Sequence, residues 1–197
     1  MVHGQSTGST ILRRSNHFRE MPHKIISQDT VYRGKVFNIE AVILEFPDGH
    51  QARYDLVKHN PSVTILPVDK DGLVYFVRQY RLGVMGDLLE LPAGVIEDSE
   101  DPEVCARREV REEIGLAASQ MTLLGQAFLI PGYGDELMYF FLAEGLTTDP
   151  LLPDPDELLD VVRFTIPEIY NLAEAGKFMD SKTLAALTLA RSKLFLR

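Results

Sequence analysis

The chain has 197 residues, of which 45% are hydrophobic, which is enough to bury a core and form one main domain with an added segment. The 29 acidic side chains outnumber the 20 Lys and Arg and give a net charge of −9, which disfavours general nucleic-acid binding. A single cysteine excludes an intrachain disulfide and favours a cytoplasmic location, and no apolar run reaches membrane-spanning or signal-peptide length, so no membrane partner is expected.

The first 60 residues divide into two parts. Residues 1–22 begin with many small polar residues and predict a flexible segment. Residues 24–46 carry β-branched and aromatic residues typical of strands, and the turn at 47–49 leads into another strand-like stretch. We expect residues 23–60 to form an antiparallel N-terminal sheet, followed by a main domain over residues 61–197.

Two apolar stretches open the main domain. Residues 62–68 and 73–80 have the composition of core strands. The Asp71-Gly72 pair between them is a strong hairpin signal. The sequence therefore predicts a β-hairpin here.

Two more strands are expected at residues 121–130 and 136–145. The stretch between them contains Pro131, Tyr133 and two glycines, which is typical of a loop that faces a ligand. Residues 147–157 contain three prolines and four acids and predict an irregular exposed loop.

The C-terminal part predicts a strand and two helices. A short strand at 159–164 is followed by a helix that opens after Thr165 and stops at Gly176. Ser181 is a suitable N-cap for the last helix, whose apolar side would carry Leu184, Leu187 and Leu194.

An acidic segment between the two pairs of strands predicts a further helix of about 13 residues. Asp101 is a suitable N-cap, Pro102 fits the first helical position, and Gly115 is a C-terminal stop. An apolar stripe that would fix this helix on a sheet is formed by Ala106, Val110 and Ile114.

Three glutamates share one side of this helix. At 100° per residue, Glu109, Glu112 and Glu113 fall within an arc of about 100°. Their mutual repulsion would be removed by a divalent cation, and Mg²⁺ binds carboxylates together with substrate phosphates. Arg108 would orient one of the carboxylates. Taken alone, the segment also fits a solvated acidic helix face.

The spacing of residues over a longer segment, from 94 to 116, favours a metal site over a solvated helix face. Gly94, Glu100, the run 108–110, Glu112-Glu113 and Gly115-Leu116 resemble the Nudix box at every specified position across 23 residues. The resemblance implies an α+β fold, an α/β/α sandwich with mixed sheets. It also implies hydrolysis of a nucleoside diphosphate linked to another moiety, with Glu100 in a structural role.

The same resemblance implies roles for the box residues. Glu109 and Glu113 resemble the principal metal ligands, Glu112 is an additional ligand or water-activating group, and the carbonyl of Ala93 is a further ligand. Glu112 and Glu113 are thus the catalytic candidates of the box. The expected cofactor is Mg²⁺, with Mn²⁺ as a possible substitute, polarising the pyrophosphate and lowering the pKa of a bound water.

Features outside the box resemble ADP-ribose pyrophosphatases and related nucleoside diphosphate-sugar hydrolases. Arg81 matches a phosphate-contacting arginine, and Glu90 is a plausible further metal or water ligand. Pro131, sixteen residues beyond Gly115, resembles the marker of the ADP-ribose-hydrolysing group. Glu157 best matches a late catalytic base in a mobile acidic loop, with Asp156 next.

The substrate and the assembly are also implied by this resemblance. Arg53 and Tyr133 are candidates for contacts with the base, and the N-terminal sheet would form a homodimer interface. The partner is then a small-molecule nucleotide sugar, with ADP-ribose first. One alternative is a different substrate, GDP-mannose or a UDP-sugar, and another is a non-catalytic nucleotide-sugar sensor. A third is a hydrolase of free nucleoside triphosphates or dinucleoside polyphosphates, but Pro131 and the N-terminal sheet disfavour that function.

Overall fold

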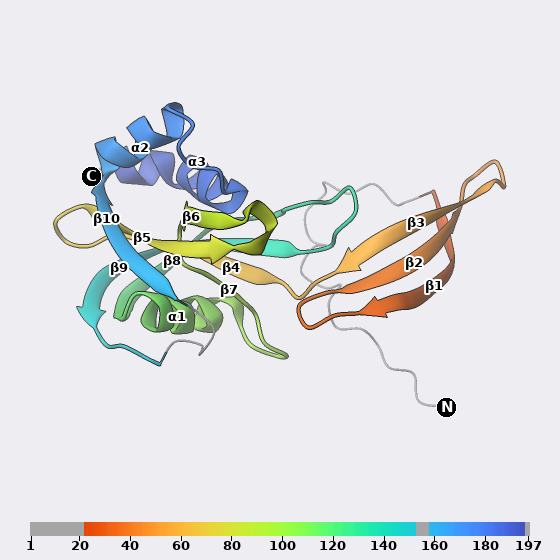
Figure 1. The fold of residues 1–197 in the computed structure, drawn as a ribbon, viewed down its shortest axis with the longest axis horizontal. Coiled ribbons are helices and arrows are strands. Elements are labelled where there is room, and N and C mark those ends of the chain that lie inside the picture. Colours follow the sequence, from red (N-terminus) through yellow and green to blue (C-terminus); the bar gives the residue numbers. More distant parts are fainter. Residues whose placement is uncertain (1–21, 153–157, 196–197) are drawn as a thin grey trace.

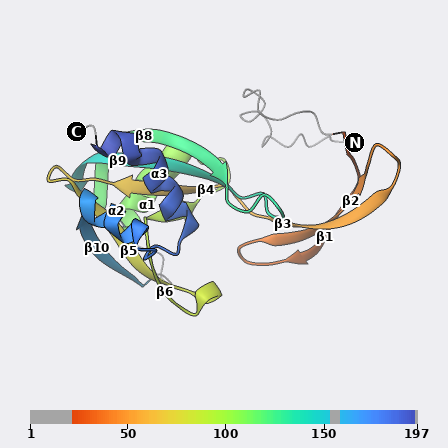
Figure 2. The same ribbon diagram turned by 90° about the horizontal axis from the view of Figure 1, so that it is seen from above.

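The computed structural model describes residues 22–152 and 158–195 (Figure 1). A larger body of sheets and helices carries a three-stranded sheet that stands out to one side, as both views show (Figures 1 and 2). The predicted flexible segment up to residue 21 and the candidate base Glu157 lie outside the described residues.

The sheet that stands out is antiparallel, as predicted, and we call it the N-terminal sheet. Its order is β1-β2-β3, with β1 (Lys24–Arg33), β2 (Asn38–Glu45) and β3 (Gln51–Lys58). The turn between β2 and β3 uses Gly49 at φ +85°, a conformation that glycine adopts without a Cβ penalty. Nearly all of β1 is exposed, including the large apolar side chains Ile25, Ile26, Val31 and Tyr32.

A four-stranded mixed sheet forms the centre of the main body. Its order is β7-β4-β9-β8, with β7 (Ala93–Val95), β4 (Ser62–Pro67), β9 (Leu137–Thr148) and β8 (Leu116–Phe128). Strands β4 and β9 are parallel and the other pairs are antiparallel. Every residue of β4 is buried, which is typical of a strand covered on both faces.

A second, antiparallel sheet has the order β10-β5-β6, with β10 (Leu159–Thr165), β5 (Leu73–Arg81) and β6 (Gly86–Glu90). A short 3-10 helix, η3 (Leu82–Val84), links β5 to β6. The predicted hairpin of β4 with β5 is wrong, because the two strands lie in different sheets and are joined by the single bridge Val68–Val74. The Asp71-Gly72 turn reverses the chain, but β4 takes its partners from β7 and β9 instead.

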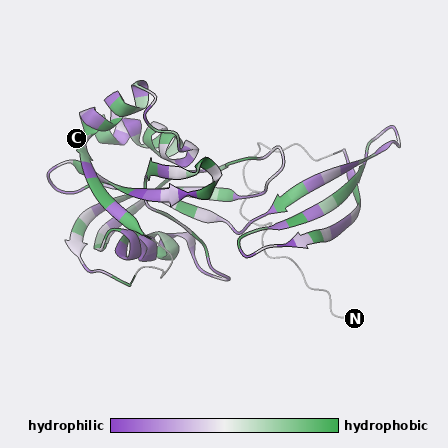
Figure 3. Cartoon of the chain, viewed as in Figure 1, coloured by the Kyte–Doolittle hydropathy of each residue, from purple (hydrophilic) through white to green (hydrophobic). Residues whose placement is uncertain are grey.

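Three helices cover the sheets and complete the predicted sandwich (Figure 1). Helix α1 (Pro102–Glu113) packs Ala106 and Val110 against one face of the four-stranded sheet. Helices α2 (Ile166–Glu174) and α3 (Ser181–Phe195) lie on the opposite side, where they share a second core with β4, β5 and β9. Seven of the twelve residues of α1 are charged, so it appears mostly hydrophilic in Figure 3.

The helix ends follow the predicted signals with one exception. Asp101 caps α1, and Thr165 with Glu168 forms a capping box on α2. Helix α3 is capped by Asp180 and not by Ser181, since Asp180 Oδ2 accepts from the backbone N of Thr183 at 3.0 Å.

Two further expectations are corrected. Leu184 lies on the exposed side of α3, and the buried side is formed by Thr183, Ala186, Leu187, Ala190 and Leu194. The short strands β6 and β7 were not predicted. Among the described residues, none of the helices has the length and apolar character needed to cross a bilayer.

Candidate active site

Two carboxylates of α1, those of Glu109 and Glu113, lie beside strand β7. Burial of Cys105, Ala106 and Val110 fixes the rotation of the helix against the sheet. Glu109 and Glu113, one turn apart, are therefore turned inward and are only 7% and 5% exposed. Carboxylate oxygens placed one turn apart on one helix side are an arrangement that a hard divalent cation can bind.

The strand opposite these glutamates supplies two of the predicted residues. The backbone N of Ala93 lies 3.3 Å from Glu113 Oε2. The next residue, Gly94, leaves room for Glu109, because a Cβ atom at position 94 would overlap the Glu109 carboxylate. Strand β7 thus places backbone atoms of Ala93 beside Glu113 and of Gly94 beside Glu109.

Arg108 forms hydrogen bonds with three acidic side chains, including Glu109 of this pair. Its Nη1 donates to Glu109 Oε1 at 2.7 Å and to Glu112 Oε2 at 2.8 Å, while Nε and Nη2 each donate to Glu100 at 3.0 Å. These hydrogen bonds raise the pKa of Arg108 and lower that of Glu100. The expectation that Arg108 orients a carboxylate agrees with this geometry.

Glu100 also closes the loop that precedes α1. Its Oε2 accepts from the backbone N of Glu97 at 3.0 Å, in addition to the bond from Arg108. This agrees with the expected structural role of Glu100, since the loop and the helix are joined through one carboxylate.

The donor set fits a hard divalent cation. Within residues 22–152 and 158–195 no three His, Cys, Asp or Glu side chains already converge as a metal cluster. The Arg108 guanidinium stands between Glu109 and Glu112 and offsets their charge. The carboxylates of Glu113 and Glu109 nevertheless lie on one helix side, beside the backbone of Ala93 and Gly94 respectively, and hard cations prefer oxygen donors.

Arg81, at the end of β5, is held by Glu90, at the end of β6. Arg81 donates from Nε at 2.9 Å and from Nη2 at 2.7 Å to the two carboxylate oxygens of Glu90. Burial alone would raise the pKa of Glu90, but the bonds from Arg81 and the charge of Lys182 lower it below its ordinary value. The expected role of Glu90 as a metal ligand is not supported by these contacts, because both oxygens are engaged by cationic side chains.

The loop with Pro131 and Tyr133 is fixed to the end of β3. Val57 N donates to the Tyr133 carbonyl at 2.7 Å, and Asp135 N donates to the Val57 carbonyl at 3.1 Å. Asp135 also pairs with Lys58. Pro131 and Tyr133 are exposed and so are accessible to a ligand.

Arg53 lies on β3, away from the end of the strand that holds the Pro131 loop. Its side chain is exposed and pairs with Asp55 at 3.1 Å. The contacts of β3 with the main body come at Val57 and Lys58, about 13 Å further along the strand at ~3.3 Å per residue. The structure therefore does not bring Arg53 to the glutamates of α1 within one chain.

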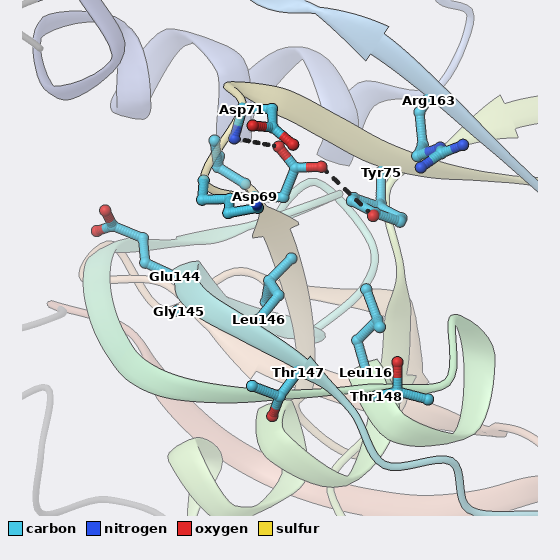
Figure 4. A pocket seen from close by; sticks show the side chains of 12 residues that line it. Asp69, Asp71, Tyr75, Leu116, Glu144, Gly145, Leu146, Thr147, Thr148 and Arg163 are labelled. Carbon is cyan, nitrogen blue, oxygen red and sulfur yellow. Dashed lines mark hydrogen bonds between the residues drawn. The ribbon is translucent and has the colours of Figure 1, made fainter.

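A cavity of about 650 Å³ opens at another place, between the β4–β5 turn and the end of β9 (Figure 4). Asp69, Tyr75, Glu144 and Arg163 are among its lining residues, and Tyr75 Oη donates to Asp69 Oδ2 at 3.4 Å. None of the described site candidates lines it. Volume alone thus does not identify the catalytic centre of this fold.

Lys182, which the sequence did not single out, contacts Glu90 beside the candidate site. It lies in the first turn of α3, and its Nζ contacts Glu90 Oε2 together with Asp180 Oδ2. A lysine at the start of a helix is ordinarily solvated, and its partner Glu90 is 92 residues away in the chain. No local signal predicts such a pair.

Comparisons with known proteins agree with this geometry. Residues 58–187 match the family described as NUDIX domain. The chain is 32% identical over 171 residues to an ADP-ribose pyrophosphatase of Bacillus subtilis (strain 168), covering 86% of this chain and 92% of the relative. It is 32% identical over 146 residues to a GDP-mannose pyrophosphatase of Yersinia pestis (strain Pestoides F), covering 69% and 73%. A crystal structure of an ADP compounds hydrolase superposes with a TM-score of 0.79 at 29% identity, covering 88% of this chain and 95% of the other.

Proposed function

The chain belongs to the NUDIX family and is a Nudix hydrolase, and on that premise we propose that it cleaves the pyrophosphate bond of ADP-ribose or a related ADP-sugar. The products are AMP and a sugar phosphate. The observation that carries the proposal is the pair of buried carboxylates, Glu109 and Glu113, set against the backbone of Ala93 and Gly94.

Nudix hydrolases depend on a divalent metal, and we propose Mg²⁺, with Mn²⁺ as a substitute. The carboxylates of Glu109, Glu112 and Glu113 and the carbonyl of Ala93 would hold it. When bound, the cation neutralises charge on the pyrophosphate and lowers the pKa of a bound water. The family resemblance, the oxygen donors and the burial of two of the carboxylates support this assignment.

The protein side chains then have separate tasks in the reaction. Arg81, held on one edge by Glu90, binds a substrate phosphate. Glu112 or Glu113 accepts the proton of the attacking water, and Arg108 keeps Glu112 in place. Glu157, outside the described residues, is the alternative base.

The sugar nucleotide is proposed from the relatives and from the loop geometry. The ADP-ribose pyrophosphatase of Bacillus subtilis matches most of the chain and so favours ADP-ribose. Tyr133 and Pro131 lie exposed on a loop fixed to β3, where they would line the sugar and base pocket. GDP-mannose is the second candidate, favoured by the similarity to a GDP-mannose pyrophosphatase.

We propose that the N-terminal sheet, residues 23–60, forms a unit distinct from the hydrolase domain, residues 61–197, and joins two copies of the chain. Exposed Ile25, Val31 and Tyr32 on β1 support an apolar interface. A homodimer would also allow Arg53, remote from α1 in its own chain, to contact the base in the partner's site. Sedimentation analysis of the protein and of a Val31→Asp variant tests this, since the variant is expected to be monomeric.

A substrate panel tests the proposed activity. The protein is incubated with Mg²⁺ and ADP-ribose, GDP-mannose, a UDP-sugar or ATP, and nucleoside monophosphate is quantified by chromatography. We expect AMP to be released from ADP-ribose with the highest kcat/KM of the panel. Tight binding of a sugar nucleotide without turnover would favour the sensor function instead, and preference for ATP would exclude the sugar-nucleotide assignment.

A further inference from the structure

A buried charge network joins helix α3 to the candidate active site. Lys182 has a side chain that is only 11% exposed, and its Nζ contacts Glu90 Oε2 and, at 3.0 Å, Asp180 Oδ2. Glu90 is 1% exposed and contacts Arg81 on its other side. The lysine and the arginine thus share one buried carboxylate.

The charges in this network are balanced. Arg81 and Lys182 supply two positive charges, and Glu90 and Asp180 supply two negative charges. A buried carboxylate needs its full set of partners, because removing one of them leaves charge in a poorly solvated site. Both Arg81 and Lys182 contact the Glu90 carboxylate and lower its pKa, so both favour its ionised form.

Lys182 is itself fixed by its helix. Asp180 accepts from the backbone N of Thr183 at 3.0 Å and from its hydroxyl at 2.6 Å. The same hydroxyl oxygen of Thr183 accepts from the backbone N of Leu91 at 3.0 Å, next to Glu90. The start of α3 is thereby attached to the segment that leads into β7.

One edge of the Arg81 guanidinium group is bound to Glu90, and the rest of the side chain is partly exposed. Nε and Nη2 are bound to Glu90, and the side chain as a whole is still 41% exposed. The hydrogen bonds to Glu90 raise the pKa of Arg81, with a further contribution from the charge of Glu113. Arg81 is therefore close enough to feel the charge of Glu113, one of the buried carboxylates of α1.

We propose that Lys182 is a positioning residue that acts through Glu90 to orient Arg81 toward a substrate phosphate. This inference rests on the proposed function. Without Lys182, Glu90 would lose one of its two cationic partners, and the network would carry an uncompensated negative charge. The Glu90 carboxylate would then turn, and the guanidinium of Arg81 would lose its fixed direction.

Steady-state kinetics with ADP-ribose and Mg²⁺ test this role. Lys182→Met is expected to lower kcat/KM about tenfold, mainly through KM, because a phosphate contact formed in the ground state is weakened. Lys182→Arg, which keeps the charge, should recover to within about threefold. Lys177→Met, at an exposed lysine ahead of α3, is the matched control and should equal the wild type.

A double-mutant cycle separates positioning from a direct effect. In an Arg81→Ala background, Lys182→Met should change kcat/KM by less than about twofold, since Lys182 acts through Arg81. The same tenfold loss in both backgrounds would overturn the proposal, and so would an unchanged single variant.

A spectroscopic readout makes the test independent of turnover. The Arg81 Nε–H resonance, assigned by its loss in Arg81→Lys, should exchange with solvent at least about tenfold faster in Lys182→Met and recover in Lys182→Arg. Unchanged exchange overturns the positioning role even in an active enzyme. If the wild type cleaves no sugar nucleotide while the exchange changes as expected, the proposed substrate class is wrong and the link from Lys182 to Arg81 stands.

Discussion

The carboxylate of Glu109 lies directly against the Cα atom of Gly94, in the space that any larger residue would fill with its Cβ. The far end of a glutamate is flexible, so Gly94→Ala would displace the carboxylate and leave the strand intact. We expect kcat/KM to fall about 100-fold or more with an unchanged circular dichroism spectrum.

Gly83→Ala is the matched control for this change. A Cβ at Gly83 would meet no atom within 4 Å, and the residue is exposed in η3. Equal activity losses in Gly83→Ala and Gly94→Ala would argue against the role assigned to this contact.

Arg108 is expected to be sensitive to replacement by lysine. The ammonium group of lysine cannot reproduce the fork that joins Glu100, Glu109 and Glu112, so the acids lose their common partner. We predict a loss of kcat of about tenfold to 100-fold in Arg108→Lys, measured with ADP-ribose and Mg²⁺. The neighbouring Arg107→Lys should keep normal kinetics, because Arg107 bonds to Glu103 and the Ala118 carbonyl.

Acid should remove the stabilisation that Glu90 provides. The pKa of Glu90 is lowered from its ordinary 4.5 in the folded protein, so its ionised form contributes stability above that pH and loses it as the pH falls through the folded pKa. The melting temperature of the wild type should exceed that of Glu90→Gln near pH 7, and the difference should shrink below about pH 4.5. A difference that stays constant down to pH 3 would contradict the pairing.

Asp135 links the Pro131 loop to β3. Its carboxylate pairs with Lys58 and accepts from the backbone N of His59 at 3.0 Å. In Asp135→Ala we expect faster hydrogen exchange at the Val57 amide, which bonds to Tyr133, and a KM raised several-fold. Exchange at Val57 that matches the wild type would show that the backbone bonds alone hold the loop.

The helix limits illustrate what a sequence can predict. Asp101, Thr165 and Gly115 act through bonds and dihedral angles within a few residues, and the structure shows each of them at the end of a helix as expected. The spacing of the glutamates likewise predicts one shared side of α1. These features need only the geometry of a helix.

Strand partners and buried ion pairs depend on the whole fold. The turn at Asp71-Gly72 predicts a reversal of the chain but not which sheet receives the next strand, so β4 and β5 were wrongly paired. Burial of every residue in β4, with Val63 and Ile65 facing α1 and Leu66 facing α3, is what places it in the centre. The contact of Lys182 with Glu90 spans 92 residues and has no local signal.

The proposed metal-dependent hydrolysis is tested by a comparison of the wild type with Glu113→Gln. Glutamine keeps the shape of this 5% exposed side chain and removes its charge, so the fold should persist while the cation site is impaired. With ADP-ribose and Mg²⁺, we predict AMP and ribose 5-phosphate from the wild type and a rate lower by about 100-fold or more from the variant. Equal rates from both proteins would contradict the role of Glu113, and no AMP from the wild type would contradict the hydrolysis of ADP-ribose.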